Sequence, residues 1–168
     1  MLTLRTLRDT DSLEELTRLL HRAYAELGAA GLNFTAVDQS PEVTAQRMAG
    51  GTCFVAHWGE TLVGTVLAKP TEPSSPCRYF RRSDVATLRQ LGVDPAHRGK
   101  GIGLRLIAAC EQWAREARFD EIALDTASPA HHLISLYRRL GYQIVDTVQW
   151  DGKTYESMVM RKRLGAAN

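Results

Sequence analysis

Glycine recurs at alternate positions directly before a helical pattern in the second half of the chain. The glycines are Gly99, Gly101 and Gly103, and Arg98 and Lys100 lie beside them. Glycine lets the backbone turn tightly and leaves no Cβ in the way, so several N–H groups can converge on one anion at the positive end of a helix dipole. The two cations suit phosphate. The pattern predicts a site for a pyrophosphate group.

Two better-known phosphate loops do not fit this stretch. A P-loop would need glycine at position 94 and serine or threonine at position 101, where the sequence has Asp94 and Gly101. A dinucleotide-binding loop needs the spacing GxGxxG, whereas the spacing here is GxGxG. A turn that only begins a helix is the alternative, but glycines inside a helix are destabilising unless something compensates. A specific anion site is therefore favoured over a plain turn.

Hydrophobic periodicity places this loop between a strand and a helix. Strands are expected at residues 2–7, 52–58, 61–69, 79 or 85–93, 121–126, 142–150 and 154–163, and helices at 12–28, 40–50, 101–117 and 128–140. The order is βααβββαβαββ. The strand–helix–strand unit implies a parallel pair and the hairpins at 59–60 and 151–152 imply antiparallel pairs. The expected fold is α/β (α+β), with a mixed sheet.

The composition excludes several classes of protein. The chain has 168 residues, 44% of them hydrophobic, and a net charge of +2, which is typical of one globular domain over residues 1–168. Basic residues do cluster near 78–82, 98–100 and 138–139, but they suit a small polyanion, so no nucleic-acid partner is expected. The apolar stretches are too short to span a bilayer, so no membrane partner is expected either.

The cysteines and histidines do not suggest a metal or a disulfide. Cys53, Cys77 and Cys110 are far apart and share no metal-binding spacing. His131 and His132 are adjacent, so they point to different faces of a helix. We therefore expect no metal and no covalent catalysis by cysteine. The first residues alternate like a strand and lack the continuous apolar core of a secretion signal, so the cytoplasm is the expected location.

The glycine-rich stretch resembles a known signature. Val93–Gly103 is similar to the acyl-CoA motif of the GNAT N-acyltransferase superfamily, in which Gln or Arg is followed at fixed spacing by Gly and by Gly or Ala. Ser135–Tyr142 resembles the second signature of that family, and the order of elements matches its fold over almost the whole chain. The resemblance implies a single-domain GNAT fold, with about seven strands flanked by about four helices, splayed at strands four and five.

The resemblance also implies a reaction and a cofactor site. The expected activity is N-acetyltransferase: an acetyl group passes from acetyl-CoA to a primary amine in a ternary complex, without a covalent enzyme intermediate. The residues expected to bind the cofactor through the strand and the loop are Leu91, Gly92, Val93, Arg98, Gly99, Lys100, Gly101, Ile102 and Gly103. Glycine inside a strand, as at position 92, commonly marks a bulge or a close backbone approach.

Tyr137 occupies the tyrosine position of the second signature, which implies that it protonates the departing CoA thiolate. The alternative is that it only packs and orients the cofactor sulfur. Many relatives carry an asparagine seven residues earlier, where this chain has Ala130. No general base is identifiable among the inward candidates Thr87, Arg89 and Leu91. Three routes to the neutral amine remain open: deprotonation through water, deprotonation by a carboxylate, or selection of the minor neutral form. The candidate carboxylates are Asp38, Glu72 and Asp84.

The acceptor is not named by the sequence. A small-molecule amine or a peptide amine would fit, and acceptor contacts are expected from Phe34, from the loop at residues 28–40 and from the connector at residues 70–82. Acyl-chain length and a homodimer are left open. Two rival functions also remain: a module that binds CoA or acyl-CoA without turnover, and an RNA-associated protein that uses the basic residues.

Overall fold

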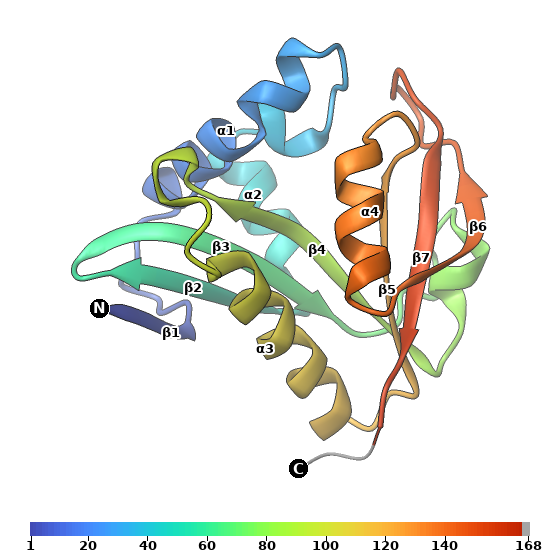
Figure 1. Cartoon of the computed structure of the whole chain (residues 1–168). Coiled ribbons are helices and arrows are strands. Elements are labelled where there is room, and N and C mark those ends of the chain that lie inside the picture. The colour runs from blue at the N-terminus through green and yellow to red at the C-terminus, as the bar shows by residue number, and fades with distance from the viewer. Residues whose placement is uncertain (166–168) are drawn as a thin grey trace. The chain divides into compact units, whose positions relative to one another are not determined.

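The expected order of elements is confirmed in the computed structural model, which describes residues 1–165 (Figure 1). The strands are β1 (Leu2–Thr6), β2 (Thr52–Trp58), β3 (Thr61–Lys69), β4 (Val85–Val93), β5 (Glu121–Ala127), β6 (Gln143–Val148) and β7 (Ser157–Arg163). The helices are α1 (Leu13–Ala29), α2 (Pro41–Met48), α3 (Ile102–Glu116) and α4 (His131–Arg139), and short 3-10 turns lie at Thr35–Val37, Arg78–Arg81 and Pro95–His97.

The strands form one mixed sheet in the order β1-β2-β3-β4-β5-β7-β6. The pairs β1–β2, β2–β3, β5–β7 and β6–β7 are antiparallel, and β4 pairs with β5 in parallel. That parallel pairing covers only Val85–Thr87 against Glu121–Ala123. The predicted fold class is therefore confirmed, including the early separation of strands four and five.

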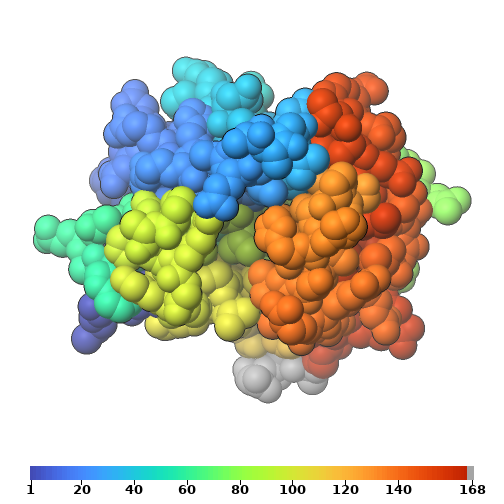
Figure 2. Space-filling model, turned by 45° about the horizontal axis from the view of Figure 1, so that its top comes forward, coloured from blue at the N-terminus to red at the C-terminus, as the bar shows by residue number. Residues whose placement is uncertain are grey.

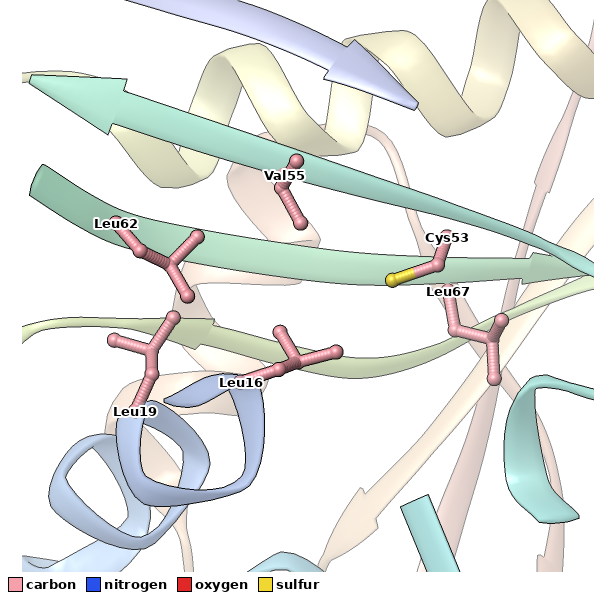
Figure 3. Close-up of a cluster of buried hydrophobic side chains, with 6 residues drawn as sticks. All are labelled: Leu16, Leu19, Cys53, Val55, Leu62 and Leu67. Carbon is pink, nitrogen blue, oxygen red and sulfur yellow. The ribbon is translucent and has the colours of Figure 1, made fainter. Parts of the chain in front are cut away.

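The chain divides into two compact units, each with its own core. Unit 1 contains Met1–Lys69 and Leu88–Cys110, and unit 2 contains Pro70–Thr87 and the chain from Glu111 onward. In unit 1, α1 packs its apolar stripe on β2 and β3, which buries the cluster Leu16, Leu19, Cys53, Val55, Leu62 and Leu67 (Figure 3). The periodic leucines of α1 create this core, as the sequence predicts. That the whole chain acts as one domain stays a prediction.

Helix α1 begins where its capping signal lies but ends later than expected. The Ser12 hydroxyl accepts from the Glu15 N–H (3.1 Å) and caps the first turn. Gly28 does not stop the helix, which continues to Ala29. A Cβ on Gly28 would lie 2.8 Å from Val37, so glycine is needed there because the following 3-10 turn approaches the helix closely. The left-handed residue after the helix is Gly31.

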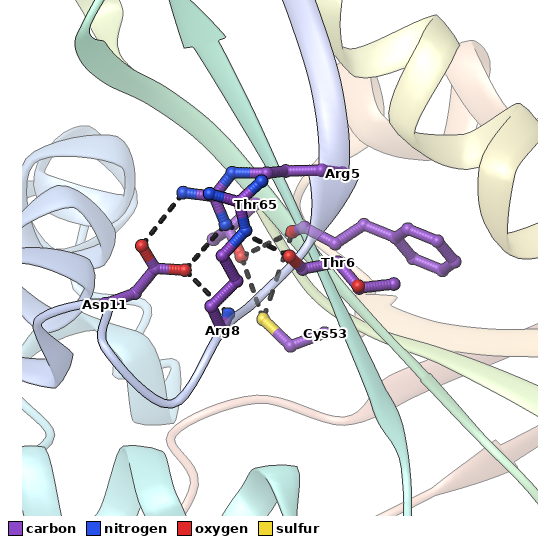
Figure 4. Close-up of polar contacts among 7 residues, drawn as sticks. Arg5, Thr6, Arg8, Asp11, Cys53 and Thr65 are labelled. Atoms are coloured by element: carbon purple, nitrogen blue, oxygen red, sulfur yellow. Dashed lines mark hydrogen bonds and ion pairs between the residues drawn. The ribbon is translucent and has the colours of Figure 1, made fainter.

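Asp11 pairs with Arg5 at the entrance to α1 (Figure 4). The Arg5 guanidinium donates to both carboxylate oxygens, at 2.6 and 2.8 Å, and the Arg8 N–H donates to one of them at 2.7 Å. These bonds hold the pKa of the Asp11 carboxyl well below its usual value. The bidentate pair thus joins the end of β1 to the start of the helix.

Replacement of Asp11 by asparagine is expected to lower the free energy of unfolding by about 1–2 kcal/mol at pH 7. A carboxyl whose pKa is depressed in the folded state stabilises that state above its unfolded pKa, about 3.9. The stabilisation is lost as the pH falls toward the folded pKa. Urea denaturation at pH 7, 5 and 3 should therefore show the difference between wild type and variant shrinking only below about pH 4. A difference independent of pH would contradict this account.

Unit 2 buries Cys77, Phe80, Val85, Ala123 and Val159, and the Trp150 ring stacks on Phe80 with ring centroids 6.4 Å apart. A half-buried ion pair between Lys162 and the buried Glu111 adds to this core. The Tyr142 hydroxyl donates to Glu111 Oε2 (2.9 Å), and Lys162 Nζ donates to Glu111 Oε1 (3.0 Å).

Unit 2 decides one open boundary and moves another. Strand β4 starts at Val85, the later of the two predicted starts, because Tyr79 lies in a 3-10 turn. Helix α4 starts at His131 with Ala130 as its N-cap, so Ser128–Pro129 does not cap it. The Ser128 N–H bonds to the Glu156 carbonyl (2.9 Å), which keeps this residue beside the end of the sheet.

The final hairpin is shorter than predicted. Strand β6 ends at Val148 and β7 begins at Ser157, instead of 150 and 154. The Gln149 side-chain amide donates to the carbonyls of Trp150, Lys153 and Tyr155, at 3.4, 3.2 and 3.0 Å. These bonds replace the ladder with a wider turn around Gly152, whose φ is +77°.

Candidate functional site: the loop between β4 and α3

The loop that follows β4 is anchored before it reaches the glycines. The Asp94 N–H donates to the Val63 carbonyl of β3 (2.8 Å), and Asp94 Oδ1 accepts from the Ala96 N–H (2.9 Å). Arg22 of α1 forms an ion pair with the second Asp94 oxygen (3.1 Å). Asp94 thereby fixes the turn between the strand and the glycine-rich loop.

Gly99 and Gly101 adopt left-handed backbone conformations, with φ of +80° and +76°. Both are exposed, and a Cβ at either position would meet nothing within 4 Å. Glycine is therefore required by the backbone conformation and not by crowding. The N–H groups of Gly99, Lys100 and Gly101 find no backbone acceptor within residues 1–165. The first N–H groups of α3, from Ile102 on, have no partner inside the helix either.

This arrangement fits the pyrophosphate of an acyl-CoA. N–H groups without backbone acceptors lie directly before a helix N-terminus, and the Cβ positions of Gly99 and Gly101 are open, which suits an anion. Gly103 contributes differently, because it lies in the first turn of α3 and a Cβ there would reach only ordinary contact with Val93, at 3.7 Å.

The two cations of the loop are engaged with neighbours in unit 1. Arg98 donates to Glu26 Oε1 (2.9 Å) and to the Ala23 carbonyl (3.0 Å), both on α1. Figure 2 shows the yellow-green surface of the loop directly beside the blue surface of α1. Lys100 Nζ lies 4.5 Å from the centre of the Trp58 ring. Arg98 thus joins the loop to α1, whereas Lys100 makes a cation–π contact with Trp58.

The strand before the loop contains an unusual residue that the sequence prediction missed. Gln90 has a φ of +59°, a left-handed conformation that is uncommon for a non-glycine residue and typical of a β-bulge. Gly92 instead marks a close approach, because a Cβ there would lie 3.1 Å from Ala23 Cβ and 3.3 Å from Leu20. The Tyr24 hydroxyl donates to the Leu91 carbonyl (2.6 Å). Helix α1 therefore lies tightly against this part of β4.

Tyr137 lies on α4 in unit 2 and is buried, with 7% of its surface exposed. Its ring packs edge-on against Tyr142, with ring centroids 5.8 Å apart and an interplanar angle of 70°. Because the Tyr142 hydroxyl is bonded to buried Glu111, the partner ring is itself fixed. Ala130, which stands where many relatives carry asparagine, is the buried N-cap of the same helix.

The structure gives the surroundings of the three carboxylates that are candidates for the general base. Hydrogen bonds from Arg82 lower the pKa of the Asp84 carboxyl, which makes it a weaker base. Asp38 is exposed in unit 1, and Glu72 is half-buried in unit 2. Thr87 is fully buried and its hydroxyl has no hydrogen-bond partner within the described residues.

The aromatic residues separate into core and surface. Phe80 and Tyr155 are buried in unit 2 and Trp150 is partly buried beside them, whereas Trp58 is 40% exposed. Phe34 packs on Tyr24, with ring centroids 5.6 Å apart. The prediction that Phe34 contributes to an acceptor pocket is compatible with this surface loop and remains untested.

Cys53, Cys77 and Cys110 are buried and form no disulfide within residues 1–165. Burial raises the pKa of the Cys53 and Cys77 thiols, which disfavours a thiolate nucleophile. Within residues 1–165, no group of three or more His, Cys, Asp or Glu side chains is arranged to hold a metal ion. In the same part of the chain, no helix combines the length and apolar character needed to cross a bilayer.

A strand–loop–helix unit of this kind, set in a mixed sheet of this order, defines a class of acyltransferase folds. The model of the acetyltransferase (GNAT) family matches residues 13–142. The chain therefore belongs to this family of acetyltransferases.

Named relatives and solved structures agree with this assignment. Human N-acetyltransferase 8B is 36% identical over 94 residues, which cover 55% of this chain and 39% of the human protein. The chain thus matches well under half the length of that relative.

Among solved structures, the ribosomal-protein-S18-alanine N-acetyltransferase from Escherichia coli superposes with a TM-score of 0.75 at 17% identity, covering 100% of this chain and 97% of that chain. A GNAT acetyltransferase from Elizabethkingia anophelis, solved with acetyl-CoA bound, gives a TM-score of 0.70 at 15% identity, covering 97% and 98%. At these identities the structures establish the fold.

Proposed function

We propose that this chain is an N-acetyltransferase that transfers the acetyl group of acetyl-CoA to a primary amine. The observation that carries the proposal is the loop at residues 98–103, with its two left-handed glycines and its N–H groups without backbone acceptors. Membership of the GNAT family supports the reaction class. The acetyl-CoA bound to the Elizabethkingia anophelis relative supports the choice of acyl donor.

Each group of residues has a proposed role. The N–H groups from Gly99 to Gly103 bind the pyrophosphate, and Lys100 adds charge after leaving the Trp58 ring. The main chain of Leu91, Gly92 and Val93 binds the extended arm of the cofactor. Tyr24 already occupies one lone pair of the Leu91 carbonyl, so the cofactor can use at most the other lone pair of this oxygen.

Acetyl-CoA supplies an acetyl group that is activated as a thioester. The neutral amine forms the new C–N bond as the C–S bond breaks, and the Tyr137 hydroxyl gives its proton to the departing thiolate. The nitrogen then loses its surplus proton through water, and this proton restores the Tyr137 hydroxyl. A main-chain N–H of β4 stabilises the oxygen on which negative charge develops. No residue of the chain becomes acetylated in this scheme, which is consistent with the buried cysteines.

The proposed acceptor is a small-molecule amine or the amine of a peptide. CoA release with a broad panel of such amines tests the proposal directly. Steady release of CoA that depends on both acetyl-CoA and one amine is the expected result, and mass spectrometry should show the gain of one acetyl group on that amine. Tight binding of CoA with no turnover for any amine would contradict the proposal and would support a module that binds CoA without catalysis. RNA binding that CoA does not compete away would contradict both.

A further inference from the structure

A buried polar network in unit 1 ends at Gln90, the left-handed residue of β4. Gln39, in the turn before α2, lies at its centre and is 5% exposed. Its side-chain NH2 group donates to Thr44 Oγ1 (2.7 Å) and to Gln90 Oε1 (3.0 Å), and its Oε1 accepts from Arg47 (2.9 Å). These bonds link Thr44 of α2, through Gln39, to Gln90 in the later part of β4.

The chemistry of arginine fixes the orientation of both amides. A guanidinium can only donate, so the oxygen of Gln39 must face Arg47. The nitrogen of Gln39 must then face Gln90, and the oxygen of Gln90 must face Gln39. Gln90 Nε2 is therefore turned away from the network.

Gln90 Nε2 is buried and has no hydrogen-bond partner among the described residues. Only 6% of the residue is exposed. A buried donor without a partner is costly, and a left-handed backbone at a non-glycine residue adds strain. The network holds Gln90 in place in spite of its unpaired donor and its left-handed backbone. Each of these two features alone would favour another type of residue at this position. Such a donor is expected where a ligand supplies the missing acceptor.

The network also strengthens this donor. The positive charge of Arg47 polarises the Gln39 amide, which in turn polarises the Gln90 amide. The terminal N–H group is therefore suited to an oxygen that carries negative charge, such as that of a carboxylate or a strongly polarised carbonyl.

The position of Gln90 along β4 indicates which ligand this oxygen belongs to. The proposed pyrophosphate loop begins at Arg98 and the proposed cofactor arm follows Leu91–Val93, so Gln90 lies one residue beyond the stretch given to the cofactor. The acetyl end of acetyl-CoA should therefore lie near Gln90, and this is where it must meet the amine. The side chain also bonds to the turn that ends at Gln39, a segment independent of the cofactor loop.

We propose that Gln90 is a specificity-determining residue whose Nε2 donates to a carboxylate or carbonyl oxygen of the amine acceptor. The proposal rests on the proposed function and adds a substrate class to it: amines that carry such an oxygen near the reacting nitrogen. Gln39 and Arg47 are positioning residues, because they act only through Gln90.

The test compares L-phenylalanine, L-phenylalaninamide and phenethylamine as acceptors, since the third lacks the oxygen. Gln90→Glu keeps an oxygen for Gln39 but replaces the donor with a second oxygen. We expect KM to rise roughly tenfold or more for the first two amines and less than about threefold for phenethylamine. Thr44→Val is the matched control, because it removes one bond of Gln39 and leaves the Gln90 donor intact.

A second measurement does not depend on turnover. In protein labelled with 15N-glutamine and loaded with CoA, the side-chain amide resonance absent from Gln90→Glu is assigned to Gln90, and L-phenylalanine should shift it while phenethylamine should not. If no amine is acetylated but this shift occurs, the proposed function fails and the role of Gln90 as a ligand donor stands. An equal fall in kcat for all three amines, or no selective effect on KM together with no shift, would overturn the proposal.

Discussion

Gly101→Asp is expected to weaken CoA binding by at least about a hundredfold, because like charges placed together cost several kcal/mol. The substitution puts a carboxylate into the loop whose N–H groups are proposed to bind the pyrophosphate. A Cβ at position 101 meets nothing within 4 Å, so the carboxylate can enter that space without displacing any neighbour. Isothermal titration with CoA measures the effect.

Two variants separate the charge from the backbone strain. Gly50 has a φ of +77°, against +76° at Gly101, and it too has open space around its Cβ position. Gly50→Asp should therefore cost similar folding stability and leave CoA affinity unchanged. Gly101→Ala introduces only the strain of a left-handed residue, about 1–2 kcal/mol. Unchanged CoA affinity in Gly101→Asp would remove the central support for the acyl-CoA site.

Tyr137→Phe is expected to lower kcat by roughly a hundredfold or more, the usual contribution of a positioned general acid. The ring remains, so packing against Tyr142 and the affinity for CoA should stay close to the wild-type values. Initial rates of thiol release at saturating acetyl-CoA and amine measure kcat, and titration with CoA measures the affinity. A fall in kcat below about tenfold, together with weaker CoA binding, would assign Tyr137 to orienting the cofactor instead.

Tyr142→Phe is the matched control for that substitution. It removes a hydroxyl that donates to Glu111, so it should lower the free energy of unfolding by about 1.5–3 kcal/mol. It should leave kcat unchanged, because the lost hydroxyl is bonded within the core. A large fall in kcat for Tyr142→Phe, with an unchanged kcat for Tyr137→Phe, would instead assign the general acid to Tyr142.

Local patterns predicted the elements around the site because their signals lie within a few residues. The strands at Thr52–Trp58 and Thr61–Lys69 have the expected bounds, since β-branched and aromatic residues flank a tight turn at Gly59. Helix α2 starts at Pro41 after its Ser40 cap for the same reason. The glycine loop was also recognisable, because alternate glycines before a helix have few structural uses.

Features that depend on distant partners could not be predicted in this way. Arg98 was expected to serve phosphate, but its partner Glu26 lies 72 residues earlier in the chain. Gln90 reads as an ordinary polar residue of a strand, and only the fold places it against Gln39 and buries its amide. The later start of α4 has a similar origin, since Ser128 is held by Glu156. Tertiary hydrogen bonds overrode the local capping signal in that case.

The bonds between α1 and the segment from Leu91 to Arg98 have a thermodynamic consequence. Tyr24 of α1 bonds to the strand before the turn, at Leu91. After the turn, Arg98 of the loop bonds to Glu26 and Ala23 of α1. The same helix leads into the turn that carries Phe34 and Gln39. A shift of α1 on binding of an acceptor would therefore move the cofactor loop through these hydrogen bonds. Linkage is reciprocal, so each substrate would change the affinity for the other by the same factor.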